Sequence, residues 1–305
     1  MLAQLTRRLV LLIPTVFVVV TLVFVAFRIV PGDPASLIAG PEATAADRAM
    51  IKRQLGLDKP LYAQYVVYLG QLVRGDLGKS LYSGRPVREE VLVRFPLTLQ
   101  LATAGLLIAV PIGILLGVIA AVYNHSRLDY GSMLFAVIGV SFPNFWIGLM
   151  LMILLSVKFG WLPSSGVGGI KHLVLPAVSL GLPAMAIIAR LTRASMLDTL
   201  HRDYIRTARA KGVRERHVLL GHALRNSLIP TTTAIGLHFG YLLGGSVVIE
   251  TLFSWPGLGD LLITAVRGRD YPIVQGAVLL FALNFVLINA VVDVLYTYLD
   301  PRTRG

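Results

Sequence analysis

The chain has 305 residues, of which 55% are hydrophobic and only 14% are charged, and its mean hydropathy is +0.73. Because soluble proteins of this size carry about 25% charged residues, the composition excludes a soluble globular protein and indicates a polytopic membrane protein. The net charge of +12 comes from basic residues in loops beside apolar runs. This placement is typical of membrane topology and contact with anionic lipid, and it argues against nucleic-acid binding. The lack of cysteine excludes disulfides and thiolate metal sites.

Six apolar runs approach or exceed the roughly 20 helical residues needed to cross the hydrocarbon core of a bilayer. They predict an all-α protein with spans at about residues 9–27, 96–122, 131–157, 173–189, 228–249 and 273–299. Six spans place both termini on one side. The short loops on that side carry fourteen Lys and Arg residues, against four on the other side. The positive-inside rule therefore predicts cytoplasmic N and C termini.

These runs divide the chain into four parts. Residues 1–30 form the first transmembrane helix, 31–95 an external cap, 96–299 a five-helix core that contains a cytoplasmic loop at 190–227, and 300–305 a cytoplasmic tail. Within the cap, apolar residues such as Leu61, Tyr65, Tyr68 and Leu69 recur at roughly helical spacing. This spacing predicts short amphipathic helices.

The spans contain almost no ionisable side chains, the exceptions being His238 and Asp293. A charge in the bilayer costs about 2.5 to 3.5 kcal/mol on insertion scales and usually marks an ion or proton path. Its scarcity disfavours an ion-coupled secondary carrier or a channel, which both stay open as alternatives. For His238, a hydrogen bond to a neighbouring helix is the more common role, and a place in a translocation pathway is the functional alternative.

Proline and glycine mark positions where the spans bend or meet. The sequence from Ser141 through Pro143 and Asn144 should break the third span. Because freed backbone groups in a membrane are tolerated only beside protein or a water-filled cavity, these three residues are candidates for a pathway lining, with a plain structural kink as the alternative. Two stripes at four-residue spacing predict close helix packing: Gly236, Gly240 and Gly244 in the fifth span, and Gly113 and Gly117 in the second.

An ordered outer loop follows the fifth span. It carries Glu250, a turn signal at Pro256, Gly257 and Gly259, and Asp270 further on. Two aromatic residues of this loop, Trp255 and Tyr271, suit the membrane interface. The sequence contains no complete Gly-x-x-x-x-Gly-Lys-Ser/Thr phosphate-binding loop, no His-Glu-x-x-His pair and no Gly-x-Ser-x-Gly elbow. No catalytic residue or metal site is therefore predicted, and an intramembrane enzyme lacks a nucleophile with a base.

The segment 198–230 is the one long, strongly charged stretch between apolar runs, with seven basic and three acidic residues. It predicts two short helices around Gly212, which can adopt the left-handed conformation that ends the first helix. Small residues, Ala208 and Ala210, precede this glycine. The layout favours a docking element, and a loop that only sets topology is the alternative.

The same segment resembles the cytoplasmic signature of the binding-protein-dependent ABC importer permeases, in the dipeptide/oligopeptide/nickel branch. The resemblance rests on Arg206-Thr207-Ala208-Arg209-Ala210-Lys211-Gly212, Leu224-Arg225-Asn226 and Ile229-Pro230. It extends over nearly the whole chain through Pro31-Gly32-Asp33-Pro34, Leu55-Gly56-Leu57-Asp58, Gly75-Asp76-Leu77-Gly78, Pro256-Gly257-Leu258-Gly259 and Arg269-Asp270-Tyr271-Pro272. The stretch 37–43 is similar to the glutathione-import members.

The resemblance implies a MetI-like, type I importer fold in the inner membrane and a division of labour among subunits. A soluble binding protein delivers cargo outside to this chain and a second homologous permease. Two ATPase subunits inside hold ATP and Mg, so this chain binds no cofactor and is not itself an enzyme. The coupling helix that contacts an ATPase would comprise Tyr204, Arg206, Thr207, Ala208, Arg209, Ala210, Lys211 and Gly212.

For cargo, the resemblance favours a short peptide such as a dipeptide, an oligopeptide or glutathione, with nickel as the alternative. Two features depart from the wider superfamily. Arg206-Thr207-Ala208 stands where many members have Glu-Ala-Ala, and Gly212 lies eighteen positions before Pro230, a longer interval than usual. Both fit the peptide branch, and both make docking geometry borrowed from sugar or amino-acid importers unsafe.

Overall fold

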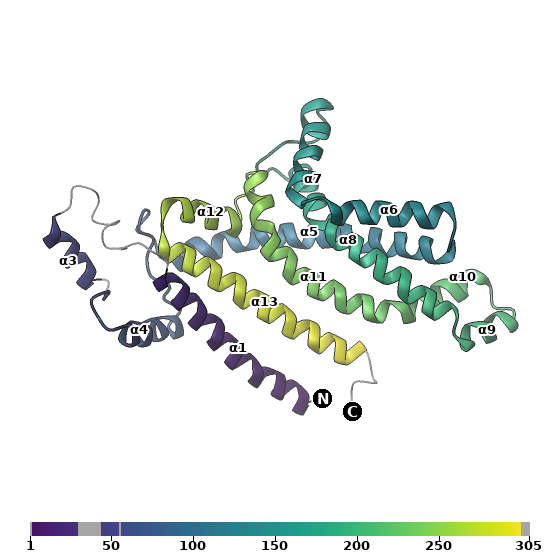
Figure 1. The fold of residues 1–305 in the computed structure, drawn as a ribbon, viewed down its shortest axis with the longest axis horizontal. Coiled ribbons are helices and arrows are strands. Elements are labelled where there is room, and N and C mark those ends of the chain that lie inside the picture. Colours follow the sequence, from purple (N-terminus) through teal and green to yellow (C-terminus); the bar gives the residue numbers. More distant parts are fainter. Residues whose placement is uncertain (1, 30–43, 55, 300–305) are drawn as a thin grey trace.

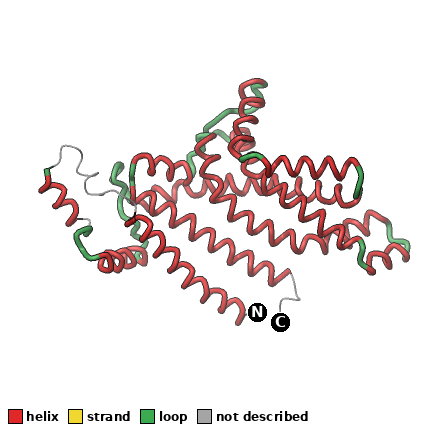
Figure 2. Tube along the Cα trace, in the orientation of Figure 1, coloured by secondary structure: helices red, strands yellow, loops and turns green. Residues whose placement is uncertain are grey.

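The computed structural model describes residues 2–29, 44–54 and 56–299. The Pro31-Gly32-Asp33-Pro34 motif, the 37–43 stretch, the 300–305 tail and the side chain of Asp293 lie outside this description. Every regular element in the described ranges is helical (Figure 2). The elements are α1 (Leu2–Ile29), α3 (Ala45–Gln54), α4 (Leu61–Val73), α5 (Val87–Val122), α6 (Arg127–Ser141), α7 (Asn144–Leu151), the π-helical η1 (Met152–Lys158), α8 (Ile170–Leu200), α9 (Asp203–Ala210), α10 (Glu215–His217), the π-helical η2 (Val218–Leu224), α11 (Arg225–Leu252), α12 (Leu258–Gly268) and α13 (Tyr271–Leu299).

The long helices run side by side along one axis of the molecule, with the cap helices α3 and α4 at one end and α9 and α10 at the other (Figure 1). Four helical stretches are long and apolar enough to cross a membrane: Val87–Val122, Ile170–Leu200, Glu215–Leu252 and Tyr271–Val292. The α6 to η1 pair supplies a fifth crossing if it is counted as one span, and α1 contributes a shorter apolar stretch, Ile13–Ala26. The count of six crossings stays a prediction.

The closest helix contact in the bundle joins α5 and α8. A β-carbon added at Gly113 would lie 2.7 Å from the Met185 carbonyl oxygen, and one added at Gly117 would lie 2.6 Å from that of Ala189. This confirms the close approach predicted for these two glycines. Gly105 of α5 and Gly181 of α8 meet at the same helix contact, although neither was predicted to pack closely. A β-carbon added at Gly181 would lie 2.5 Å from the Gly105 carbonyl oxygen.

The predicted break in the third span is present, and it is sharper than a kink. α6 ends at Ser141, α7 begins at Asn144, and the two halves of the span are bent by 105°. The expectation that residues 131–157 form one span stays a prediction, because the bent pair can be counted as a single crossing. Pro143 lacks the backbone N–H and restricts the residue before it to extended conformations, so the helix cannot continue through Phe142. Figure 1 shows α7 leaving the bundle at a steep angle.

Candidate functional site

The charged segment between α8 and α11 folds as two short helices joined by a left-handed turn. α9 ends at Ala210, and Gly212 follows with φ +76°, which confirms the predicted conformation. The chain then passes through α10 and η2 directly into α11. Because glycine adopts this backbone conformation at little cost, Gly212 fixes the angle between α9 and the helix that re-enters the bundle.

One buried side chain anchors α9 to the membrane helices. Ile205 is fully buried in a cluster with Ala121 of α5, Met196 of α8, and Val218 and Ala223 of η2. Beside it, the Tyr204 hydroxyl accepts a hydrogen bond from Asn226 Nδ2 at 3.2 Å. A displacement of α9 would therefore be passed to α5, α8 and η2 at once, as expected of an element that moves as a rigid body.

The remaining surface of α9 is exposed and basic. Arg206, Thr207, Ala210 and Lys211 are exposed, whereas Ala208 is half-buried against the Ile205 cluster. Arg209 Nη2 lies 2.7 Å from Glu215 Oε1 across the Gly212 turn, and the hydrogen bond to Glu215 raises the pKa of the Arg209 guanidinium. The segment thus offers a partner subunit a short helix with small residues and positive charge, while Ala208 serves packing within the chain.

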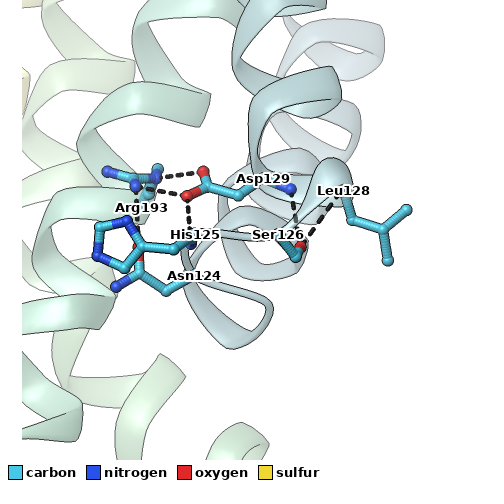
Figure 3. Close-up of polar contacts among 6 residues, drawn as sticks. All are labelled: Asn124, His125, Ser126, Leu128, Asp129 and Arg193. Atoms are coloured by element: carbon cyan, nitrogen blue, oxygen red, sulfur yellow. Dashed lines mark hydrogen bonds and ion pairs between the residues drawn. The ribbon is translucent and has the colours of Figure 1, made fainter.

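A bidentate ion pair joins α6 to α8 near the end of the bundle that carries α9 (Figure 3). Arg193 Nε and Nη2 each donate to a carboxylate oxygen of Asp129 at 2.7 Å, and Nη2 also donates to Asn124 Oδ1 at 3.0 Å. The His125 amide donates to Asp129 at 3.0 Å, and Asp129 is only 2% exposed. Two parallel charge-assisted hydrogen bonds fix the α5–α6 hairpin against the part of α8 that leads into α9.

The predicted pathway residues at the α6–α7 break make only local hydrogen bonds. Ser141 Oγ donates to the Val137 carbonyl, and Asn144 Oδ1 accepts from the Phe145 amide, both at 2.9 Å. Ser141 and Pro143 are exposed on this chain and Asn144 is half-buried. Their place at a bend between two helices is compatible with a pathway lining, and the assignment stays a prediction.

His238 lies elsewhere, so the structure does not unite the four pathway candidates. α7 packs against the C-terminal end of α11, where Gly148 meets Leu252. At about 1.5 Å per residue, His238 is roughly 21 Å from Leu252 along α11, towards the N-terminal end of this helix. Its ring is half-buried and centred 5.9 Å from that of Tyr241, which in turn contacts Phe285 of α13. These contacts favour a packing role for His238.

The glycine stripe of α11 packs against α13 over two of its three positions. An added β-carbon at Gly236 would overlap Val292, and one at Gly240 would lie 3.0 Å from the Phe285 ring. The third position, Gly244, has no atom within 4 Å of such a carbon. Gly244 therefore faces open space within this chain, and its packing role stays a prediction.

The outer loop is organised around a buried carboxylate. Glu250 is fully buried, and its Oε2 accepts hydrogen bonds from the Gly259 amide at 2.7 Å and the Asp260 amide at 3.1 Å, at the start of α12. Gly257 is required here because a β-carbon would lie 2.6 Å from Thr98 Oγ1. Pro256 precedes this glycine in the same turn. The loop motif is thus a helix-capping device.

Asp270, which follows α12, is a second buried carboxylate that accepts hydrogen bonds. It is 4% exposed and accepts from Ser80 Oγ at 2.5 Å and from the Leu81 amide at 3.2 Å, which ties the cap to the start of α13. Trp255 is only 1% exposed, and its indole N–H donates to the Leu97 carbonyl at 3.0 Å. Its predicted place at the membrane interface is wrong, because the loop folds inward over the start of α5.

Two known protein families together match almost the whole chain. Residues 113–305 match the family described as binding-protein-dependent transport system inner membrane component, and residues 1–102 match the N-terminal family of such membrane components. The chain is 51% identical over 304 residues to the glutathione transport system permease protein GsiC of Escherichia coli O6:H1, covering 100% of this chain and 99% of that protein. It is 50% identical, with the same coverage, to GsiC of Shigella dysenteriae serotype 1.

Two solved structures share the fold. One is an inward-facing MetNI methionine ABC transporter, with a TM-score of 0.60 and 19% identity over 68% of this chain and 95% of that chain. The other is an amino acid ABC transporter with histidines, with a TM-score of 0.52 and 15% identity over 69% of this chain and 92% of that chain. The chain therefore belongs to the binding-protein-dependent transport system inner membrane components, the permease subunits of ABC importers.

Proposed function

We propose that this permease carries short peptides, with glutathione favoured, through the inner membrane. The observation that supports the cargo is the 50–51% identity to glutathione permeases over essentially the full length of both proteins. In this proposal the chain pairs with a second homologous permease. An external binding protein delivers the peptide, and two ATPase subunits inside hold ATP and Mg.

The geometry of the cytoplasmic end supports a coupling role for Tyr204 and Arg206 to Gly212. α9 exposes small and basic residues on one side and buries Ile205 on the other. When ATPase subunits close and reopen, a helix held in this way would carry their motion into α5, α8 and η2, and through Arg193 and Asp129 into α6. The bundle would then alternate between outward-facing and inward-facing arrangements.

The character of the spans also supports a zwitterionic cargo. The long helices offer few charges to the membrane interior, so a passing peptide would meet polar, largely uncharged walls, and recognition would rest on the binding protein. Nickel would more plausibly travel as a chelate. A bare transition-metal ion needs a cluster of such ligands as His, Cys, Asp or Glu. In the described residues, no group of three or more of these side chains is placed to hold a metal ion.

The proposed orientation has both termini in the cytoplasm, α9 inside and the cap outside. The absence of native cysteine allows a direct test with a membrane-impermeant thiol reagent on intact cells. Tyr82, in the cap loop, is 75% exposed, and His201, before α9, is also exposed. Labelling of Tyr82→Cys without labelling of His201→Cys is expected. The reverse pattern would contradict the orientation.

Cargo and energy source can be separated in one uptake experiment. Cells that express the full set of subunits, with or without this gene, receive radiolabelled glutathione, a dialanine peptide or nickel. A parallel strain carries an ATPase subunit that cannot hydrolyse ATP. We expect peptide uptake to need both this gene and hydrolysis. Loss of nickel uptake alone would leave the family intact and refute the cargo, and peptide uptake without hydrolysis would indicate an ion-coupled carrier or a channel.

A further inference from the structure

The cap helix α4 contains no charged residue. Its thirteen residues, LYAQYVVYLGQLV, lie between Lys59 and Arg74. None of them is buried, and a stripe on one side is strongly exposed: Tyr62 is 75%, Val66 65% and Val73 89% exposed. A helix that covers a water-soluble domain turns its apolar side to the core and its polar side to solvent. In α4 the apolar stripe faces away from the protein.

The two glutamines of α4, Gln64 half-buried and Gln71 exposed, lie on the other side of the helix from this stripe. Gln64 and Gln71 line a cavity of about 560 Å³ that is bounded across from α4 by Gln275 and neighbouring residues of α13. The arrangement is inverted relative to a helix in water. It is the arrangement expected of a helix with an apolar surface outside the protein and a hydrated space inside.

The third side of α4 contacts α1 well inside the apolar part of that helix. The hydroxyls of Tyr65 and Thr21 hydrogen-bond at 2.5 Å, and the Phe24 ring lies 5.1 Å from that of Tyr65 and 5.4 Å from that of Tyr68. The apolar stretch of α1, Ile13–Ala26, continues about 7 Å beyond Thr21 at 1.5 Å per residue. α4 therefore lies beside the C-terminal end of α1 (Figure 1), and its tyrosine side chains reach the apolar stretch of that helix.

The exposed side chains of α1 at this level are also apolar. Phe17, Val18, Leu22 and Val25 are each at least 40% exposed, as expected of a surface in contact with lipid. The Tyr62, Val66 and Val73 stripe extends this surface sideways from α1. A soluble partner that binds and leaves would normally meet a surface about as polar as the rest of the protein, which a thirteen-residue stretch without charge does not provide.

We propose that α4 is an interfacial helix that buries its Tyr62, Val66 and Val73 stripe in the outer leaflet of the bilayer. The partner of this surface is lipid acyl chain, with Lys59 and Arg74 at the two ends of the helix placed to reach headgroup phosphates. The cap would then be anchored at the membrane on one side of the polar cavity. The inference depends on α1 crossing the membrane and is independent of the cargo.

The test uses the intact transporter in lipid nanodiscs with single nitroxide-labelled cysteines. The chain offers a matched pair, because Tyr62 on α4 and Tyr82 in the cap loop are both tyrosines that are 75% exposed. Accessibility to oxygen, which partitions into lipid, is compared with accessibility to a water-soluble nickel chelate. For Tyr62→Cys we expect an oxygen-to-chelate ratio about threefold or more above that of Tyr82→Cys. Val66→Cys should agree with Tyr62→Cys and replaces it if that variant does not assemble.

Equal ratios at the two tyrosine positions would overturn the proposal, because the stripe would then lie in water. Chelate access at Tyr62→Cys that disappears only when the binding protein is added would also overturn it, because the occupant would then be a protein. Glutathione uptake plays no part in these readings, so a wrong cargo and a wrong location of α4 give different results.

Discussion

The outer loop and the coupling segment both contain charged residues and glycine, but the outer loop buries two of its carboxylates, whereas the coupling segment exposes its basic side chains. In the loop around α12, Glu250 is fully buried and Asp270 is 4% exposed, and both accept hydrogen bonds from backbone amides. At the opposite end of the bundle, around α9, the Arg206 side chain is 72% exposed and Lys211 is also exposed.

This difference separates residues that hold the fold from residues that meet a partner. Removing a buried acceptor leaves amides unpaired, so the substitution lowers the free energy of unfolding. An exposed basic residue contributes little to stability, and its value lies in what it contacts. Substitutions at the outer loop should therefore unfold or deplete the protein, whereas substitutions on exposed α9 should leave a stable protein that transports poorly.

Glu250→Ala should have the largest effect on stability. It removes the acceptor for the Gly259 and Asp260 amides, and at about 1 to 3 kcal/mol for each unpaired buried amide the loss is about 2 to 6 kcal/mol. Thermal unfolding of the purified complex measures it. Glu250→Gln keeps one acceptor oxygen and should lose less, while exposed Glu89→Ala is the control. A Glu250→Ala protein as stable as this control would contradict the capping role.

Arg193→Ala should come next, because it leaves the buried Asp129 carboxylate without its bidentate partner. Breaking a buried pair costs about 3 to 5 kcal/mol, and the loss here should fall to about 2 to 3 kcal/mol since Arg193 is partly exposed. The exchanged pair, Asp129→Arg with Arg193→Asp, should recover part of the stability. If each single variant unfolds at the wild-type temperature, the ion pair does not hold α6 to α8.

Gly212→Val should affect stability least of the three. A β-carbon at Gly212 has open space around it, so the cost comes from the backbone at φ +76° and amounts to about 1 to 2 kcal/mol. The turn should open, and binding-protein stimulation of ATP hydrolysis should be lost. Gly131→Val is the matched control, since Gly131 also has open space but no left-handed backbone. Normal stimulation in Gly212→Val would show that the turn angle is unimportant.

Sequence reasoning succeeded where the signal is local. The apolar runs located the long helices, Pro143 located the break in the third span, and Gly212 was expected to take positive φ. Gly113 and Gly117 were expected to allow close packing. Each of these rests on the intrinsic preference of one residue or on a periodicity within one helix.

The remaining features depend on packing between distant segments. Arg193 and Asp129 are 64 positions apart, and nothing in either neighbourhood indicates that they meet. The 105° bend follows from what α7 packs against, while Pro143 alone requires only that the helix end. Likewise, an apolar stripe on α4 indicates a buried face, but periodicity cannot tell whether protein or lipid buries it.

The central claim is that exposed α9 receives the motion of an ATPase partner, and Ala210→Glu tests it most directly. Ala210 is exposed on α9, so this change should leave the fold intact, and Ala46→Glu on the cap helix α3 is the control because Ala46 is also exposed. The complete transporter, with its binding protein, is reconstituted in proteoliposomes, and glutathione uptake is measured together with ATP hydrolysis. Ala210→Glu should lower uptake about tenfold, equivalent to roughly 1.4 kcal/mol of lost contact, at unchanged thermal stability. Wild-type uptake with wild-type stimulation of hydrolysis in Ala210→Glu would contradict the account.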